Sequence, residues 1–131
     1  MLPQPVRVFI VDDSAELIEA LAELIADPGI VEIAGSRDSA RAAVAEIERL
    51  RPDLIIVDLQ LADGNGFEVV KSIRSLPHNE NMIIALFTNH KSHELERHAA
   101  AAGANCFLDK SNDHGRLLGL IQEIVRHRQA S

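Results

Sequence analysis

Short apolar runs rich in β-branched residues alternate along the whole chain with longer segments whose apolar residues recur at helical spacing. The runs cover five ranges, which are 6–11, 30–35, 54–57, 82–87 and 105–108. Because none of them alternates polar with apolar residues, both faces of these strands are expected to be buried. Such strands joined by amphipathic helices predict a parallel sheet with right-handed crossovers and helices on both faces. The sequence therefore predicts a three-layer α/β domain.

The helical segments between these runs differ in how much apolar surface they offer a core. The first three carry stripes at helical spacing, of which the one with Leu17, Leu21 and Ile25 is the clearest. The fourth, over 92–102, offers only one leucine and a few alanines before Gly103 ends it. We therefore expect the fourth helix to be the most weakly anchored.

The fifth helical segment has a wider apolar arc than burial on one side requires. Its apolar residues are Leu117, Leu118, Leu120, Ile121, Ile124 and Val125. A stripe of about 100° is enough for a helix that covers one face of a sheet. Part of this arc is therefore expected either to face a partner or to consist of ordinary surface leucines.

Composition places the chain among single-domain globular proteins. A length of 131 residues with 47% hydrophobic residues suits one domain with a sizeable core, so we assign 1–131 to a single domain. The net charge of -7 and the scattered basic residues argue against direct binding of nucleic acid. No apolar run approaches the roughly 20 residues that span a bilayer, and the start lacks a signal-peptide pattern. We therefore expect a cytoplasmic protein without membrane contact.

Polar residues follow the predicted strands at the points where they end. Asp12 and Asp13 follow the first strand, and Asp58, Thr88 and Lys110 follow the third, fourth and fifth. Each residue alone could cap a helix or brace a turn. In open parallel sheets, however, ligands bind beyond the carboxyl ends of the strands. Three carboxylates, a hydroxyl and an ammonium are therefore expected at one edge of the sheet.

This combination of groups suits phosphoryl chemistry. Three close carboxylates repel one another unless a cation neutralises them, and Mg²⁺ binds one or two carboxylates together with phosphate oxygens. Lys110 and Thr88 can then contact the oxygens of a transferred phosphoryl group. Asp58 can act as the nucleophile and form an aspartyl-phosphate.

Four segments carry a resemblance to a known family. They are "VDDS" after the first strand, "IIVDLQLADGNGFEVV" around the third, "FTN" after the fourth and "GANCFLDK" through the fifth. Together they closely resemble the receiver domain of bacterial two-component response regulators, from about residue 6 to residue 125. The resemblance implies a flavodoxin-like fold whose five strands have the order 2-1-3-4-5.

The resemblance also implies roles for individual residues. Asp58 would be phosphorylated, Thr88 would contact the phosphoryl oxygens, and Lys110 would pair with Asp58 and the phosphoryl group. Phe107 would be the aromatic residue whose rotamer follows the movement of Thr88. The implied ligands of Mg²⁺ are Asp12, Asp13, Asp58 and the backbone carbonyl of Gln60, with Asp13 binding directly and Asp12 largely through water.

Partners follow from the same resemblance. The phosphoryl donor would be a phosphohistidine on a sensor kinase or a histidine phosphotransfer protein. The output surface would be formed by the fourth helix, fifth strand and fifth helix, and would bind a downstream protein whose identity the sequence does not give. A homodimer through the fourth and fifth helices is a further expectation. The chain is expected to work as a binding switch and not as an enzyme.

The sequence departs from the family pattern at several positions. Ser111 follows Lys110 where most receivers have a proline after a cis peptide bond, so this bond is either trans or a strained cis bond. Ala62 stands where the loop after the phospho-acceptor commonly has proline, which predicts a looser, glycine-built turn. Gln60 and His90 occupy positions that modulate loss of the phosphoryl group in the family, and His90 can change charge near neutral pH. Phe107 lacks the hydroxyl of a tyrosine, so switching would rest on packing.

Histidines gather around the start of the fourth helix and raise the question of a transition-metal site. They are His90, His93 and His98, with Glu94 among them. On a helix His93 and His98 point to different faces, so at most two ligands converge. A polar, partly exposed helix face is the preferred interpretation.

Other functions were compared with the phosphorylation switch. A nucleotide-binding enzyme is disfavoured because "VDDSAE" replaces a glycine-rich loop after the first strand. An aspartate-based phosphatase would need its nucleophile after the first strand and a substrate cap, and neither is evident. A pseudo-receiver that binds partners without being phosphorylated is kept open by Ser111. The chain could be a stand-alone receiver or one cut from a longer regulator.

Overall fold

The computed structural model describes residues 4–130 and contains a five-stranded parallel sheet. The strands of this sheet are β1 (Val6–Val11), β2 (Val31–Arg37), β3 (Leu54–Asp58), β6 (Ile83–Thr88) and β7 (Cys106–Asp109). Their spatial order is β2-β1-β3-β6-β7, which is 2-1-3-4-5 when only the strands of this sheet are counted. The predicted α/β fold class and strand order are therefore confirmed.

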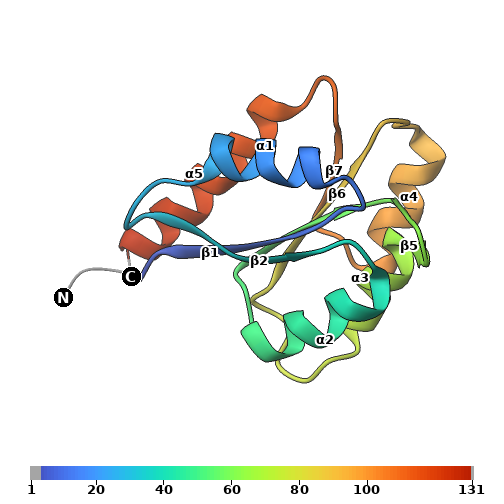
Figure 1. The fold of residues 1–131 in the computed structure, drawn as a ribbon, viewed down its shortest axis with the longest axis horizontal. Helices are drawn as coiled ribbons and strands as arrows, with labels where there is room; N and C mark the ends of the chain where they lie inside the picture. Colours follow the sequence, from blue (N-terminus) through green and yellow to red (C-terminus); the bar gives the residue numbers. More distant parts are fainter. Residues whose placement is uncertain (1–3, 131) are drawn as a thin grey trace.

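Five helices cover the two faces of the sheet (Figure 1). They are α1 (Ala15–Ile25), α2 (Ala40–Leu50), α3 (Gly66–Arg74), α4 (His93–Ala102) and α5 (His114–Ala130). The helices α1 and α5 lie on one face, and α2, α3 and α4 lie on the other (Figure 1). Each face has its own core: Leu21 and Ile121 pack with Ile10 on one side, and Ile47 and Ile73 pack with Phe9 on the other.

Side-chain caps begin the first four helices where the sequence changes from strand to helix. Each capping residue is extended, and its side-chain oxygen accepts a hydrogen bond from the backbone N–H three residues later. This bond gives a partner to an N–H group of the first turn that has none within the helix. The caps are Ser14, Ser39, Asn65 and Ser92. The α3 cap is reciprocal, because Asn65 also donates from its side-chain amide to the carboxylate of Glu68. Polar residues at these positions thus fix where each helix starts.

A short hairpin that the sequence did not predict follows β3. It consists of β4 (Gln60–Leu61) and β5 (Gly64–Asn65), which pair in antiparallel fashion. We expected a loose, glycine-built turn in this segment. The pairing between Gln60 and Asn65 instead orders the loop, and its two-residue strands are too short to leave a periodic pattern in the sequence.

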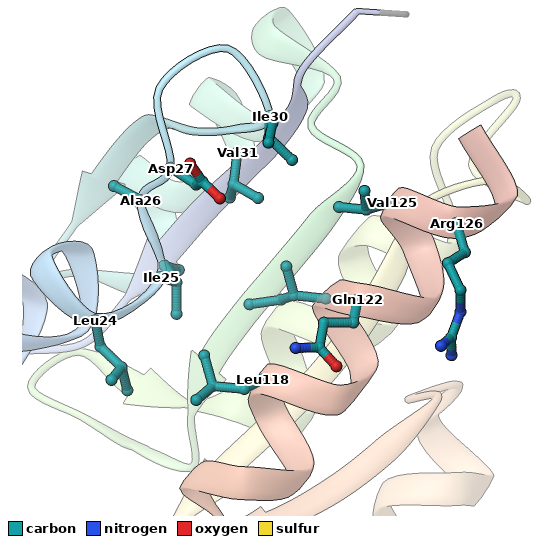
Figure 2. Close-up of a pocket in the computed structure, with 11 residues that line it drawn as sticks. Leu24, Ile25, Ala26, Asp27, Ile30, Val31, Leu118, Gln122, Val125 and Arg126 are labelled. Atoms are coloured by element: carbon teal, nitrogen blue, oxygen red, sulfur yellow. The ribbon is translucent and has the colours of Figure 1, made fainter. Parts of the chain in front are cut away.

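A groove of about 520 Å³ lies between the end of α1, the start of β2 and α5. Figure 2 shows Leu118 and Val125 of α5 facing the side of the groove that carries Leu24 and Ile30. Leu24 and Ile30 are exposed, whereas the apolar arc of α5 is buried or half-buried against the sheet and α1. This groove is at the amino-terminal edge of the strands, far from their carboxyl ends. Within residues 4–130, no helix has both the length and the apolarity needed to cross a bilayer.

Candidate functional site

A small cleft of about 250 Å³ opens at the carboxyl edge of the central strands. It is lined by Asp12, Asp13, Ser14, Asp58, Gln60, Thr88, Asn89, His90 and Lys110. The predicted site residues therefore come together, with the exception of Phe107. Asn89 was not singled out from the sequence, and its only signal was its place directly after Thr88 at a strand end.

Lys110 bridges two buried carboxylates in this cleft. Its Nζ lies 2.9 Å from Oδ2 of Asp12 and 3.2 Å from Oδ2 of Asp58. Asp12 is only 2% exposed and Asp58 only 7%. The second oxygen of each carboxylate accepts a backbone N–H, from Ser14 at 2.8 Å and from Gln60 at 3.3 Å. Local backbone and one lysine thus hold both carboxylates in place.

The electrostatics of the cleft raise the pKa of Asp58 above its ordinary value. Burial is the largest cause, and the negative charge of Asp12 adds to it, while Lys110 acts in the opposite direction. For Lys110, burial is the largest single effect and lowers the pKa. The hydrogen bond and charge of Asp12, followed by the charge of Asp58, outweigh this and raise the pKa of Lys110 overall. The lysine therefore remains charged while negative charge stays in excess around it.

Asp13 completes a group of three carboxylates that could hold a cation. One oxygen from each of Asp12, Asp13 and Asp58 lies within 4.8 Å of the other two. Asp13 is exposed, so its carboxylate can reach a ligand from the solvent side. Carboxylate oxygens together with water are the ligands that Mg²⁺ prefers. Among residues 4–130 no other group of three such ligand side chains occurs, and the histidines near α4 form none.

Thr88 and Lys110 are positioned by the paired ends of β6 and β7. The backbone N–H of Lys110 donates to the carbonyl of Thr88 at 2.8 Å. The Thr88 hydroxyl is buried and accepts the backbone N–H of His90 at 3.1 Å. This contact holds the start of the loop that carries His90 beside the carboxylates.

The loop after Lys110 is held by two aspartates. The bond between Lys110 and Ser111 is trans, which decides between the two conformations considered for it. Oδ1 of Asp109 accepts the backbone N–H of Ser111 at 2.7 Å, and Oδ2 of Asp113 accepts that of Asp109 at 2.8 Å. Sequence reasoning missed this brace. Its signal was the "DKSND" run, because aspartates commonly bond backbone groups two to four residues away in turns.

Phe107 lies outside the cleft, in the core beneath α4. It pairs with Leu86 across the strands β7 and β6 and belongs to the same apolar cluster as Ala99 and Ala102. The helix α4 is thus anchored mainly by two alanines, which agrees with the expectation from its sequence. Phe107 therefore connects the sheet to α4 and does not line the cleft.

The doubly wound sheet and the cleft with its carboxylates and lysine define an α/β domain with an acidic site at the topological switch point. The family model "Response regulator receiver domain" matches residues 8–122. The chain therefore belongs to the receiver domain family of response regulators, as the sequence motifs predicted.

Individual relatives agree with this assignment. The chemotaxis protein CheY of Thermotoga maritima is 29% identical over 120 residues, which cover 92% of this chain and 98% of CheY. A protein-glutamate methylesterase/protein-glutamine glutaminase of Nocardioides is 31% identical over 122 residues, covering 92% of this chain. The chain spans only 33% of that relative. A LuxR-family response regulator of Aurantimonas superposes with a TM-score of 0.84 and 26% identity, covering 96% of this chain and 89% of that structure.

Proposed function

We propose that this receiver domain is a phosphorylation-dependent switch in which Asp58 accepts a phosphoryl group. The phosphoryl donor would be a phosphohistidine of a sensor kinase or of a histidine phosphotransfer protein. The observation that carries the proposal is the Asp58 carboxylate in the cleft, with the Lys110 Nζ 3.2 Å from its Oδ2. The end of β3 and the N–H of Gln60 hold this carboxylate in place before the donor arrives.

The transfer forms one bond and breaks one. An oxygen of Asp58 bonds to phosphorus while the P–N bond of the donor breaks, and its electron pair leaves on the imidazole nitrogen. The attacking oxygen must be deprotonated, which the nearby Lys110 ammonium favours. The same ammonium and the Thr88 hydroxyl are placed to bind the oxygens of the transferred group, where negative charge is spread in the transition state.

The residues of the cleft also fit Mg²⁺. The oxygen donors that would hold it are the carboxylates of Asp12, Asp13 and Asp58 and the backbone carbonyl of Gln60. Three carboxylates against one ammonium leave the cleft with excess negative charge, which would repel an incoming phosphoryl group. When bound, the cation would supply the charge that offsets this repulsion.

The output of the switch is assigned to the face formed by α4, β7 and α5. Thr88 ends β6 at the cleft, and Phe107 links β7 to Ala99 and Ala102 of α4. A helix held mainly by two small side chains needs little energy to shift, which suits an element with two positions. A downstream protein, or a second copy through α4 and α5, would read the change in this face. The chain itself turns over no substrate in this proposal, and it acts in the cytoplasm.

Gln60 and His90 would set how long the phosphoryl group persists. Both line the cleft, and both side chains are exposed. They therefore lie where water must approach the phosphorus atom of the adduct. Substituting either residue should change the rate of adduct loss more than the rate of adduct formation.

Labelling with a small phospho-donor tests the proposal. The chain is incubated with acetyl phosphate and Mg²⁺, and the wild type should form an acid-stable, base-labile adduct that Asp58→Asn does not form. Asp38→Asn is a control that changes an exposed carboxylate outside the cleft. An unlabelled wild type would instead make the chain a pseudo-receiver, and steady release of phosphate from an ester substrate would indicate a phosphatase.

A further inference from the structure

The hairpin that follows Asp58 is too small to be stable by itself. Its strands have two residues each, and an isolated hairpin is marginal even when it is longer. Neither of its turn residues, Ala62 and Asp63, has a positive φ. The turn is therefore not of the primed type that matches the twist of paired strands. Something outside the hairpin must hold its tip.

Asp63 makes that outside contact, with the start of α2. Its Oδ1 accepts the backbone N–H of Ala40 at 2.7 Å, and its Oδ2 accepts that of Arg41 at 3.3 Å. Ser39 caps the next donor, because its hydroxyl accepts the N–H of Ala42. The free N–H groups of the first turn of α2 are thus divided between a local cap and a residue more than 20 positions away. The bonds from Ala40 and Arg41 also hold the pKa of Asp63 below its ordinary value, which indicates that the carboxylate is ionised in this contact.

The base of the hairpin is fixed independently of Asp63. The N–H of Gly66 donates to the carbonyl of Leu59 at 2.8 Å, and Asn65 caps α3. A Cβ at Gly66 would lie 2.6 Å from the carbonyl oxygen of Asp58, so this crossing of the chain is closely packed. Between these fixed points, Gln60 and the turn are secured by the pairing with Asn65 and by Asp63.

We propose that Asp63 is a positioning residue for the Mg²⁺ site, because its bond to α2 sets where the loop presents the backbone carbonyl of Gln60. The inference rests on the proposed function, in which that carbonyl is a metal ligand. Metal binding and the contact of Asp63 with α2 are then coupled in both directions. A cation that orders Gln60 must also stabilise the contact between Asp63 and the first turn of α2. Residues that orient metal ligands without touching the metal commonly have this role, and their removal weakens metal binding about 10-fold or more.

Calorimetric titration of MgCl₂ into the unphosphorylated chain tests this inference. Asp63→Ala should weaken Mg²⁺ binding about 10-fold, and Asp63→Asn should weaken it less, since an amide oxygen still accepts one N–H. The rate of labelling by acetyl phosphate should fall in Asp63→Ala at low Mg²⁺ and return to the wild-type rate once Mg²⁺ is saturating. Amide exchange at Ala40 and Arg41 should slow on addition of Mg²⁺ in the wild type and not in Asp63→Ala.

Two matched variants separate positioning from stability and from charge. Ser39→Ala removes a cap from the same turn of α2 without touching the hairpin. Asp38→Ala removes an exposed acidic side chain next to that turn. Both should bind Mg²⁺ as the wild type does. Equal Mg²⁺ affinity in Asp63→Ala and wild type would overturn the inference, as would an equal loss in Ser39→Ala. A wild type that binds no Mg²⁺ would overturn the metal site and this inference together, whereas Mg²⁺ binding without labelling would overturn only the phospho-acceptor.

Discussion

Lys110 lies closer to Asp12 than to Asp58, with its Nζ 2.9 Å from Asp12 Oδ2 and 3.2 Å from Asp58 Oδ2. The lysine is therefore shared, and Asp12 receives the shorter of its two contacts. Sharing leaves Asp58 only partly compensated, which agrees with its raised pKa. A phosphoryl group on Asp58 would carry more charge than Asp12 and would draw the ammonium toward itself.

Removal of the lysine should leave two buried carboxylates facing each other. Lys110→Ala is expected to lower the free energy of unfolding at pH 7 by roughly 1–3 kcal/mol, less than for a fully buried pair because water reaches the cleft. The deficit should shrink toward acid pH as Asp58 takes up a proton. Urea unfolding in the presence of EDTA measures both effects. Lys91→Ala breaks the ion pair with Asp113 and should cost under about 1 kcal/mol; a cost as large as that of Lys110→Ala would contradict this account.

The raised pKa of Asp58 makes its ionisation unfavourable for folding. The contribution of protonated Asp58 to the stability of the fold is complete when the pH is below its ordinary pKa of 3.8. This contribution is lost as the pH rises through the folded-state pKa of Asp58. Asp58→Asn resembles the neutral form, so it should be more stable than the wild type at pH 7 without Mg²⁺ and equal to it in acid. Urea midpoints measured across this pH range test the sign.

Asp63 should affect the pH dependence of stability in the opposite direction to Asp58. Its pKa is lowered, so its contribution is present at neutral pH and is lost as the pH falls through the folded-state pKa. Asp63→Asn should therefore be less stable than the wild type at pH 7, with the difference fading in acid. If both variants shifted stability in the same direction at pH 7, the assignment of the two carboxylates would be wrong.

The parts of the fold that repeat along the chain could be predicted from the sequence, and parts that depend on contacts between distant residues could not. The five main strands lie within two residues of their predicted ranges. The end of β2 was predicted two residues early, because Ser36 and Arg37 are polar and become strand only by pairing with Ile10 and Val11. Hydrophobic period carries no information about such pairing.

The candidate site shows the same division. Its residues could be predicted because each one ends a strand, and parallel strands bring their ends together. The pairing of Lys110 with Asp58 also followed, from the family resemblance, but the other partners of these side chains could not be predicted. Nothing local indicates that Lys110 contacts Asp12 across 98 positions, or that Asp63 reaches α2. The hydrogen bonds that Asp109 and Asp113 make in the loop around Ser111 were not predicted, because the family pattern has a proline at position 111 and does not indicate them.

Gly66 is expected to be the most restrictive glycine near the site. An added Cβ would lie 2.6 Å from the Asp58 carbonyl oxygen and 2.7 Å from Cδ2 of Leu86, so the backbone would have to move. Gly66→Ala should cost about 3 kcal/mol. Gly119→Ala is the control, because nothing lies within 4 Å of its added Cβ inside α5, and it should stabilise the chain by about 1 kcal/mol. Thermal unfolding of the two variants should shift in opposite directions, and a loss of stability in both would refute the steric explanation.

Arg128 ties the end of α5 to the sheet, and this tie should be measurable. Its guanidinium donates to Oδ1 of Asp53 at 2.6 Å and to the carbonyl of Pro5 at 2.8 Å. Because these are charge-assisted bonds from two nitrogens of one planar group, Arg128→Ala should cost about 1–2 kcal/mol and Arg128→Lys should recover little of it. Arg126→Ala should cost under about 0.5 kcal/mol, since Arg126 is exposed and, among the residues that the structure describes, forms an ion pair only with Glu123 on its own helix. Urea unfolding gives the costs, and amide exchange should rise in the last turns of α5 only in the Arg128 variants. Equal exchange in the Arg126 and Arg128 variants would show that α5 is held by its apolar arc alone.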